Sequence, residues 1–103
     1  MRNGTGYVVV RAAEIVWFEG ADNHVRIHSR TQSYLLRTTL SELERTLDPR
    51  LFLRIHRSVI ISIDEVRTID NWGHGEHLFV LHDGTRLTSS RRYRAAVRAA
   101  FGV

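Results

Sequence analysis

Short runs in which apolar and polar residues alternate dominate this chain, and they predict β-strands separated by turns. From position 24 to position 28 the alternation places Val25 and Ile27 toward a core. The polar His24, Arg26 and His28 then share the opposite face. Further strands are predicted at residues 7–11, 15–19, 33–37, 59–63, 66–69, 77–81 and 85–88, with turns at 20–23, 71–75 and 83–84. The pattern therefore predicts a mainly β fold.

One segment has the period of a short helix instead. Leu40, Leu43 and Leu47 recur at i, i+3 and i+7, Thr39 opens a capping-box sequence, and Pro49 ends the pattern. The outward positions of this helix are mainly acidic: Glu42, Glu44 and Arg45. Because such a face repels large anions, we expect this helix to be scaffold and not part of an anion-binding surface.

A second helix is predicted from Ser90 to the end of the chain. Its expected inner face carries Tyr93, Val97 and Ala100. Its expected outer face carries three arginines: Arg91, Arg94 and Arg98.

Length and composition indicate one small intracellular domain. The chain has 103 residues, contains no cysteine, and has no apolar stretch approaching the roughly 18 residues that span a bilayer. We expect residues 1–6 to be a linker remnant or tag and residues 7–103 to be the domain, cut from or appended to a larger regulator. The expected location is the cytoplasm, without contact with a membrane.

The formal charge is +4, and all fifteen basic residues are arginine. A GC-rich genome would favour arginine codons by itself, so this composition supports a polyanionic partner only weakly. The placement of the arginines is more informative. Two basic clusters, Phe52–Ser62 and Ser89–Arg94, flank the β-rich middle of the chain and would form an anion-binding surface if they met. Nucleic acid is the large anion that this pattern favours.

The C-terminal cluster has a local electrostatic cost that favours a functional role. Arg91 and Arg92 fall in the expected first turn of the second helix, where the helix macrodipole disfavours cations. If Ser90 caps this helix, free amide groups and two guanidinium groups point the same way, toward a phosphate or a guanine edge. The alternative is a solvated arginine pair that happens to begin a helix.

In the central cluster, Arg57 and Ser58 are two adjacent donors at the start of a predicted strand and would fit one phosphate. His56 is as consistent with a structural role, donating to a backbone carbonyl, as with DNA contact. Arg54 would be structural if it paired with Asp48 or Glu65.

Asn23 and His24 lie where a turn leads into a strand, so their side chains can project beyond the sheet into a groove. A turn asparagine and a surface histidine explain the same pattern equally well. The aromatic residues within predicted strands are expected in the core, not as stacking platforms for bases: Trp17, Phe18, Tyr34 and Phe79.

No cofactor, metal site or enzymatic activity is expected. His24 and His28 are separated by about 13 Å along a strand, too far to share one ion. His74 and His77 flank a glycine turn, but no carboxylate or cysteine beside them completes a ligand set. The chain has neither the nucleophile-elbow sequence nor paired carboxylates in a recognisable motif.

Five segments in this order resemble the LytTR-type DNA-binding domain. They are Ile15–Gly20, Tyr34–Arg37, Leu40–Leu47, Phe52–Ser62 and Ser89–Tyr93. The resemblance implies an elongated set of small antiparallel β-sheets with one or two short helices, found at the C-terminus of bacterial response regulators of two-component systems. It implies sequence-specific binding to double-stranded promoter DNA, with base contacts from loops and two copies on direct repeats.

The resemblance also assigns roles to residues. His24 falls where the family reads one major groove, Arg92 where it reads the next, and Arg57 beside the intervening minor groove. Some members of the family carry Tyr or Asn at the first and middle positions, so the base preference of this chain cannot be copied from a relative. The partners implied are promoter DNA, a second copy, and a receiver or sensor domain. An interaction or dimerisation module without intrinsic sequence reading is the alternative that the sequence leaves open.

Overall fold

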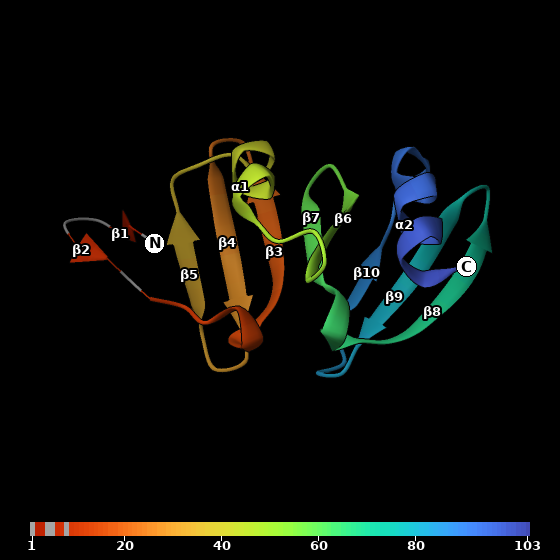
Figure 1. Ribbon diagram of the computed structural model, residues 1–103, viewed down its shortest axis with the longest axis horizontal. Coiled ribbons are helices and arrows are strands. Elements are labelled where there is room, and N and C mark those ends of the chain that lie inside the picture. The colour runs from red at the N-terminus through yellow and green to blue at the C-terminus, as the bar shows by residue number, and fades with distance from the viewer. Residues whose placement is uncertain (1, 4–5, 8) are drawn as a thin grey trace.

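The computed structural model describes residues 2–3, 6–7 and 9–103 (Figure 1). Among these residues the strands are β1 (Arg2–Asn3), β2 (Gly6–Tyr7), β3 (Ile15–Ala21), β4 (His24–Ser29), β5 (Ser33–Leu36), β6 (Phe52–His56), β7 (Val59–Ser62), β8 (Val66–Gly73), β9 (Glu76–Leu81) and β10 (Arg86–Thr88). The helices are α1 (Leu40–Thr46) and α2 (Arg94–Phe101), with single 3₁₀ turns η1 (Ala12–Glu14), η2 (Ile63–Glu65) and η3 (Arg91–Tyr93). None of the helices in this part of the chain is long and apolar enough to cross a membrane.

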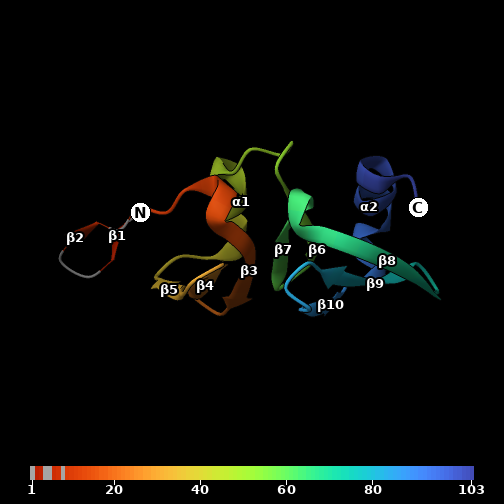
Figure 2. The ribbon, with the colours of Figure 1, turned by 90° about the horizontal axis from the view of Figure 1, so that it is seen from below.

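The strands form small antiparallel sheets placed along one long axis. A five-stranded sheet has the order β5-β4-β3-β7-β6, a three-stranded sheet has the order β10-β9-β8, and β1 pairs with β2. The molecule measures 45 × 24 × 20 Å. Figure 2 shows α1 and α2 on the same side of the molecule, one beside each of the larger sheets. The predicted fold class, a mainly β and elongated set of antiparallel sheets with two short helices, is confirmed.

Two hydrophobic cores share strand β7, which is why its sequence is apolar without alternation. Ile60 belongs to the core under α1, whereas Val59 and Ile61 belong to the core beside α2. All residues of β7 are buried, because successive side chains of a strand point to opposite faces and each face of β7 is covered. The predicted core aromatics Phe18 and Phe79 are fully buried. Trp17 and Tyr34 are half-buried and pack against the edges of the cores.

Helix α1 begins and packs as its sequence predicts. The Thr39 hydroxyl accepts a hydrogen bond from the backbone N–H of Glu42 at 3.1 Å, and Leu40 and Leu43 are buried. Gly20 of β3 permits this packing, since a Cβ atom there would lie 3.1 Å from the Leu40 Cβ. The helix therefore lies directly against β3, beside the β3–β4 turn.

The C-terminal helix differs from its prediction in two respects. Its first turn is the 3₁₀ turn η3, and the Ser90 side chain makes no capping hydrogen bond. Val97 is buried as predicted, but Ala100 is exposed and Phe101 packs against the core in its place. Positions 100 and 101 lie three and four residues after Val97 and so border the same side of the helix, where the larger apolar side chain of Phe101 fills the core.

Two strand predictions are corrected as well. A strand was predicted at residues 7–11, but residues 9–11 form no strand and only Tyr7 is paired. Position 8 lies outside the described residues. Strand β6 was not predicted, because its pairing register with β7 shifts between Arg54 and His56 and this interrupts the period of two. Of the predicted linker at 1–6, residues 1, 4 and 5 lie outside the described residues, and its separation from the domain stays a prediction.

Candidate nucleic-acid interface

Three two-residue hairpin turns and the start of α2 lie along one edge of the molecule (Figure 1). The turns are Asp22–Asn23 between β3 and β4, Arg57–Ser58 between β6 and β7, and His74–Gly75 between β8 and β9. Short turns on paired strands fix the direction of their side chains more tightly than long loops do. All sequence-predicted site residues fall in, or directly beside, the first two turns and η3.

The β3–β4 turn presents Asn23 and His24 to solvent. Ala21 pairs with His24 across the turn, and Asp22 adopts a positive φ of 51°, a conformation that aspartate tolerates better than most residues. Asn23 and His24 are both exposed, while the next residue, Val25, is fully buried. The buried Val25 anchors the strand directly behind the exposed pair.

Arg57 and Ser58 form the β6–β7 turn and do not lie at the start of an isolated strand. Neither residue has the positive φ that favoured two-residue hairpin turns use. The turn is held by His56 instead: its Nδ1 accepts a hydrogen bond from the backbone N–H of Ser58 at 3.1 Å and lies 2.9 Å from the Ser58 hydroxyl. The expected bond from His56 to a backbone carbonyl is absent among the described residues, and the ring instead holds the turn through its Nδ1.

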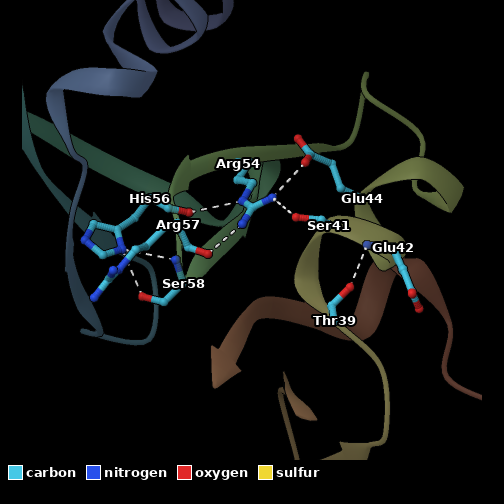
Figure 3. Close-up of polar contacts among 8 residues, drawn as sticks. All are labelled: Thr39, Ser41, Glu42, Glu44, Arg54, His56, Arg57 and Ser58. Carbon is cyan, nitrogen blue, oxygen red and sulfur yellow. Dashed lines mark hydrogen bonds and ion pairs between the residues drawn. The ribbon is translucent and has the colours of Figure 1, made fainter. Parts of the chain in front are cut away.

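The largely buried side chain of Arg54 holds the same turn through hydrogen bonds to its backbone carbonyls (Figure 3). Its guanidinium group donates to the carbonyl oxygens of His56 (3.3 Å) and Arg57 (2.6 Å). The same group donates to the Ser41 hydroxyl (3.0 Å) and the Glu44 carboxylate (3.1 Å) of α1. Only 12% of the Arg54 side chain is exposed. Arg54 therefore joins α1 to the turn that carries Arg57.

The predicted structural role of Arg54 is thus correct in kind, but its predicted partners are wrong. Asp48 bonds to Arg50, and this side-chain hydrogen bond lowers the pKa of Asp48 below its ordinary value. Glu65 is buried and pairs with Arg30 at 2.6 Å. Both carboxylates are already used, and Glu44 of α1 lies nearer to the guanidinium group of Arg54.

The start of α2 is tied to two strands. The backbone N–H of Ser90 donates to the Ile55 carbonyl at 2.9 Å. The backbone N–H of Ser89 donates to the His77 carbonyl at 2.9 Å, and the Ser89 hydroxyl accepts from the His77 N–H at 3.0 Å. Arg91 and Arg92 are exposed directly after these anchors.

Tyr93 connects the two basic clusters. The guanidinium carbons of Arg54 and Arg92 each lie 5.8 Å from the centre of the Tyr93 ring, within the range of a cation–π contact. The clusters Phe52–Ser62 and Ser89–Arg94 therefore do meet, which is the condition that the sequence left open for a shared anion-binding surface. The ring gives Arg92 a fixed support beside the β6–β7 turn.

The first two turns line one cavity of about 490 Å³, together with the start of α1. Arg57, His56 and Asp22 contribute to its walls. Among the described residues, no carboxylate lies within 4.0 Å of Arg57, Arg91 or Arg92. These cations are therefore available to an external anion.

The residues that the structure describes contain no group of three or more His, Asp or Glu side chains that could hold a metal ion. His28 is engaged elsewhere: it stacks on Trp17 with ring centres 4.3 Å apart and hydrogen-bonds Glu19 at 2.9 Å.

Sequence reasoning missed the role of Arg54 as a support for the turn and the third hairpin turn of this edge. The signal for Arg54 was its position three residues before Arg57. Once β6 is recognised as a strand, this spacing places Arg54 in the strand directly before the turn that carries Arg57. The signal for the third turn was the sequence Gly73-His74-Gly75, which was predicted as a turn but not as part of the site.

Comparison with known proteins shows which family and which relatives this chain resembles. Residues 5–102 match the sequence profile of the LytTr DNA-binding domain. The chain is 28% identical over 90 residues to the sensory transduction protein LytT of Bacillus subtilis, covering 87% of this chain and 37% of that protein. It is 27% identical over 77 residues to the transcriptional regulatory protein LytR of Staphylococcus aureus, covering 75% of this chain and 31% of that protein. The chain thus spans about a third of the length of these relatives.

A solved structure shares the fold. It is the LytTr DNA-binding domain of a Bacillus cereus protein described as a methyl-accepting/DNA response regulator. The TM-score is 0.87 at 22% sequence identity, with 99% of this chain and 94% of that chain covered.

Proposed function

Since the chain belongs to the LytTR family of DNA-binding domains, we propose that it regulates transcription by reading double-stranded promoter DNA with the turns along one edge. The observation that carries this proposal is the order of the exposed donors on that edge. His24 precedes the β6–β7 turn with Arg57, and η3 with Arg92 follows (Figure 1). The exposed arginines there have no carboxylate partner among the described residues.

The placement of the donors on separate elements supports a footprint with more than one contact region. The β3–β4 turn, the β6–β7 turn and η3 follow one another along one edge of the molecule (Figure 1). Such an edge fits one face of a duplex, where a minor groove lies between two successive major grooves.

The proposed roles follow this order. His24 reads the first major groove, Arg92 reads the second, and Arg57 contacts the backbone beside the minor groove. The residues flanking these three are proposed to position them or to contact phosphates: Asn23, His56, Ser58, Ser90 and Arg91. Helix α1 is scaffold in this arrangement, because it supports the turns through Arg54 and does not carry the donors.

The wider setting is part of the proposal. The named relatives are a sensory transduction protein and a transcriptional regulatory protein, and this chain matches about a third of each. We therefore propose that the domain is the output part of a bacterial regulator, joined to a receiver or sensor domain, and acts in the cytoplasm on direct repeats as two copies. The family's role is DNA binding, which is consistent with a protein that is not an enzyme. Neither the family nor the named relatives support the interaction-module alternative.

Selection from randomised duplex DNA tests the proposal. The purified chain is mixed with the pool at moderate salt, where nonspecific contacts are weakened, and the bound fraction is sequenced. We expect a motif that recurs at about one helical turn, roughly 10 base pairs. An unenriched pool from a folded sample would contradict intrinsic sequence reading by this domain.

A further inference from the structure

A second basic cavity lies beyond Arg92, between the β8–β9 turn and α2. Its volume is about 210 Å³, enough for a phosphate group with water, since one water occupies about 30 Å³ of liquid volume. Five polar side chains line it: Asn71, His74, His77, Arg94 and Arg98. The β8–β9 turn belongs to the same edge as the turns with Asn23 and Arg57 (Figure 1).

The two arginines of this cavity have no Asp or Glu partner among the described residues. Arg94 and Arg98 lie four positions apart and so project from the same side of α2. In the described part of the chain, neither has a carboxylate within 4.0 Å, and no Asp or Glu side chain lines the cavity. Two like charges at this spacing destabilise a helix, so an anion between them would relieve a local cost.

A buried imidazole contributes to the wall of this cavity. His77 is 5% exposed, and its Nδ1 is buried without a hydrogen-bond partner among the described residues. Buried polar atoms in folded proteins are nearly always satisfied, so each exception calls for an explanation. His77 lies in the wall of the same cavity as the two arginines.

The turn is also built to touch the arginines. His74 has φ 54° and Gly75 has φ 80°, the left-handed pair that a tight hairpin turn requires. A Cβ atom on Gly75 would lie 3.0 Å from the Arg94 Cδ and 3.4 Å from the Arg91 Cγ. The glycine therefore lets the turn pack directly on the stems of both arginines and hold their direction.

We propose that this cavity, formed by His74, His77, Arg94 and Arg98, binds a phosphate group of the DNA backbone and lengthens the footprint past the base read by Arg92. The proposal rests on the proposed DNA-binding function. A DNA phosphate and a free phosphate-containing ligand would both present anionic oxygens to this cavity. The experiment must therefore distinguish the DNA backbone from a free ligand.

The first measurement is the salt dependence of DNA affinity for Arg98→Gln. One lost phosphate contact reduces the slope of log affinity against log salt by about 1. We expect this reduction, equal for selected and unrelated sequences. Arg67→Gln is the matched control: it removes the same charge from an exposed position near the start of β8, about 20 Å along the strand from the turn. An Arg98→Gln slope equal to the Arg67→Gln slope would overturn the proposal.

The second measurement replaces single phosphates of the selected duplex by neutral methylphosphonates. At the phosphate bound by the cavity, we expect the methylphosphonate to lower the DNA affinity of the wild-type protein. The same methylphosphonate should not lower the DNA affinity of the Arg98→Gln variant further. Equal losses in both proteins at every position would also overturn the proposal. Because the duplex comes from the selection experiment, success there with failure here removes only the cavity from the footprint, whereas failure of the selection removes the proposed function.

Titration with inorganic phosphate distinguishes the two sources. Amide shifts of residues 73–76 are followed with and without DNA. We expect that DNA at micromolar concentration shifts these amides and that millimolar inorganic phosphate does not displace it. Saturation by inorganic phosphate alone, with the DNA salt slope unchanged in Arg98→Gln, would assign the cavity to a free anion and contradict the proposed source.

Discussion

At the scale of single residues, Arg54 and Arg57 show how neighbouring arginines acquire different tasks. Arg57 is exposed without a carboxylate partner among the described residues, whereas Arg54 donates to two carbonyls, a hydroxyl and a carboxylate. Their positions in β6 and its turn decide this. The side chain of a strand residue points to one face of the sheet, whereas the side chain of a turn residue can project past the ends of the strands. Arg54 is a positioning residue, and Arg57 is the proposed contact.

Replacing Arg54 by Met keeps the length of the stem and removes every donor. We expect the free energy of unfolding to fall by about 1.5–3 kcal/mol, since hydrogen bonds to a charged group are lost from a nearly buried site. DNA affinity falls equally for all sequences, because the Arg57 turn loosens. Denaturant unfolding and DNA titration check both effects.

Arg50→Met is the control for that substitution, since the Arg50 side chain is 87% exposed and, among the residues that the structure describes, pairs only with Asp48. We expect it to leave stability and DNA affinity nearly unchanged, because exposed ion pairs contribute little. Equal losses of stability in the two variants would show that Arg54 has no special role.

Arg92→Ala tests the proposed base contact. We expect a loss of about 1–3 kcal/mol on the selected site and relaxed preference at one base position. Arg86→Ala, an exposed arginine at the start of β10, removes the same kind of charge at the end of that strand away from Ser90. Titrations against single-base variants of the site check this, and unchanged affinity in a folded Arg92→Ala protein would refute the assigned role.

At the scale of elements, the hairpin turns combine a rigid backbone with exposed tips. Each of the three turns has two residues, and each is tied to its neighbours by different means. The β6–β7 turn uses side-chain bonds from His56 and Arg54, while the β8–β9 turn uses left-handed backbone conformations at His74 and Gly75. The donors along the edge are thus fixed before DNA arrives, which reduces the ordering cost of binding.

Gly75→Ala measures how closely the third turn packs on α2. Alanine at φ 80° is strained, and its Cβ also meets the Arg94 stem, so we expect a clear loss of stability, more than about 1 kcal/mol. Gly84→Ala is the control, because Gly84 has φ 90° but no atom within 4 Å of the added Cβ. Thermal unfolding of both variants separates backbone strain from the contact with Arg94, and identical losses would mean that this contact carries no energy.

At the scale of the whole molecule, β7 joins the two halves into one structure. Ile60 lies in one core while Val59 and Ile61 lie in the other, so neither half can move without disturbing a shared strand. A rigid connection matters for the proposed function, because His24 and Arg92 belong to different halves and must keep the spacing of successive grooves.

Ile61→Ala tests this coupling. We expect a loss of about 2–5 kcal/mol, the usual range for a fully buried large-to-small change, and faster amide exchange in both sheets alike. Leu35→Ala, at a side chain that is 48% exposed, should change little. Faster exchange confined to the β8–β10 sheet would show that the halves unfold independently.

The sequence alone determined the elements whose signals are local. The alternation of polar and apolar residues correctly predicted that Val25 and Ile27 of β4 are buried. The spacing of the leucines, together with Thr39, correctly predicted α1. Both patterns reflect the geometry of a single strand or a single helix turn. The ordered motifs also identified the family and, with it, the fold class. The two basic clusters were visible as charge along the chain.

Only the tertiary structure decided which donors are free and which are used. The bulge in β6 hid this strand from a period of two, so its hairpin with β7 and the position of Arg57 in a turn required the pairing partner. The partners of Arg54 depend on where α1 packs, and the packing of Phe101 in place of Ala100 depends on how α2 lies against the second core. These features arise from contacts between segments distant in sequence, and no local pattern encodes such contacts.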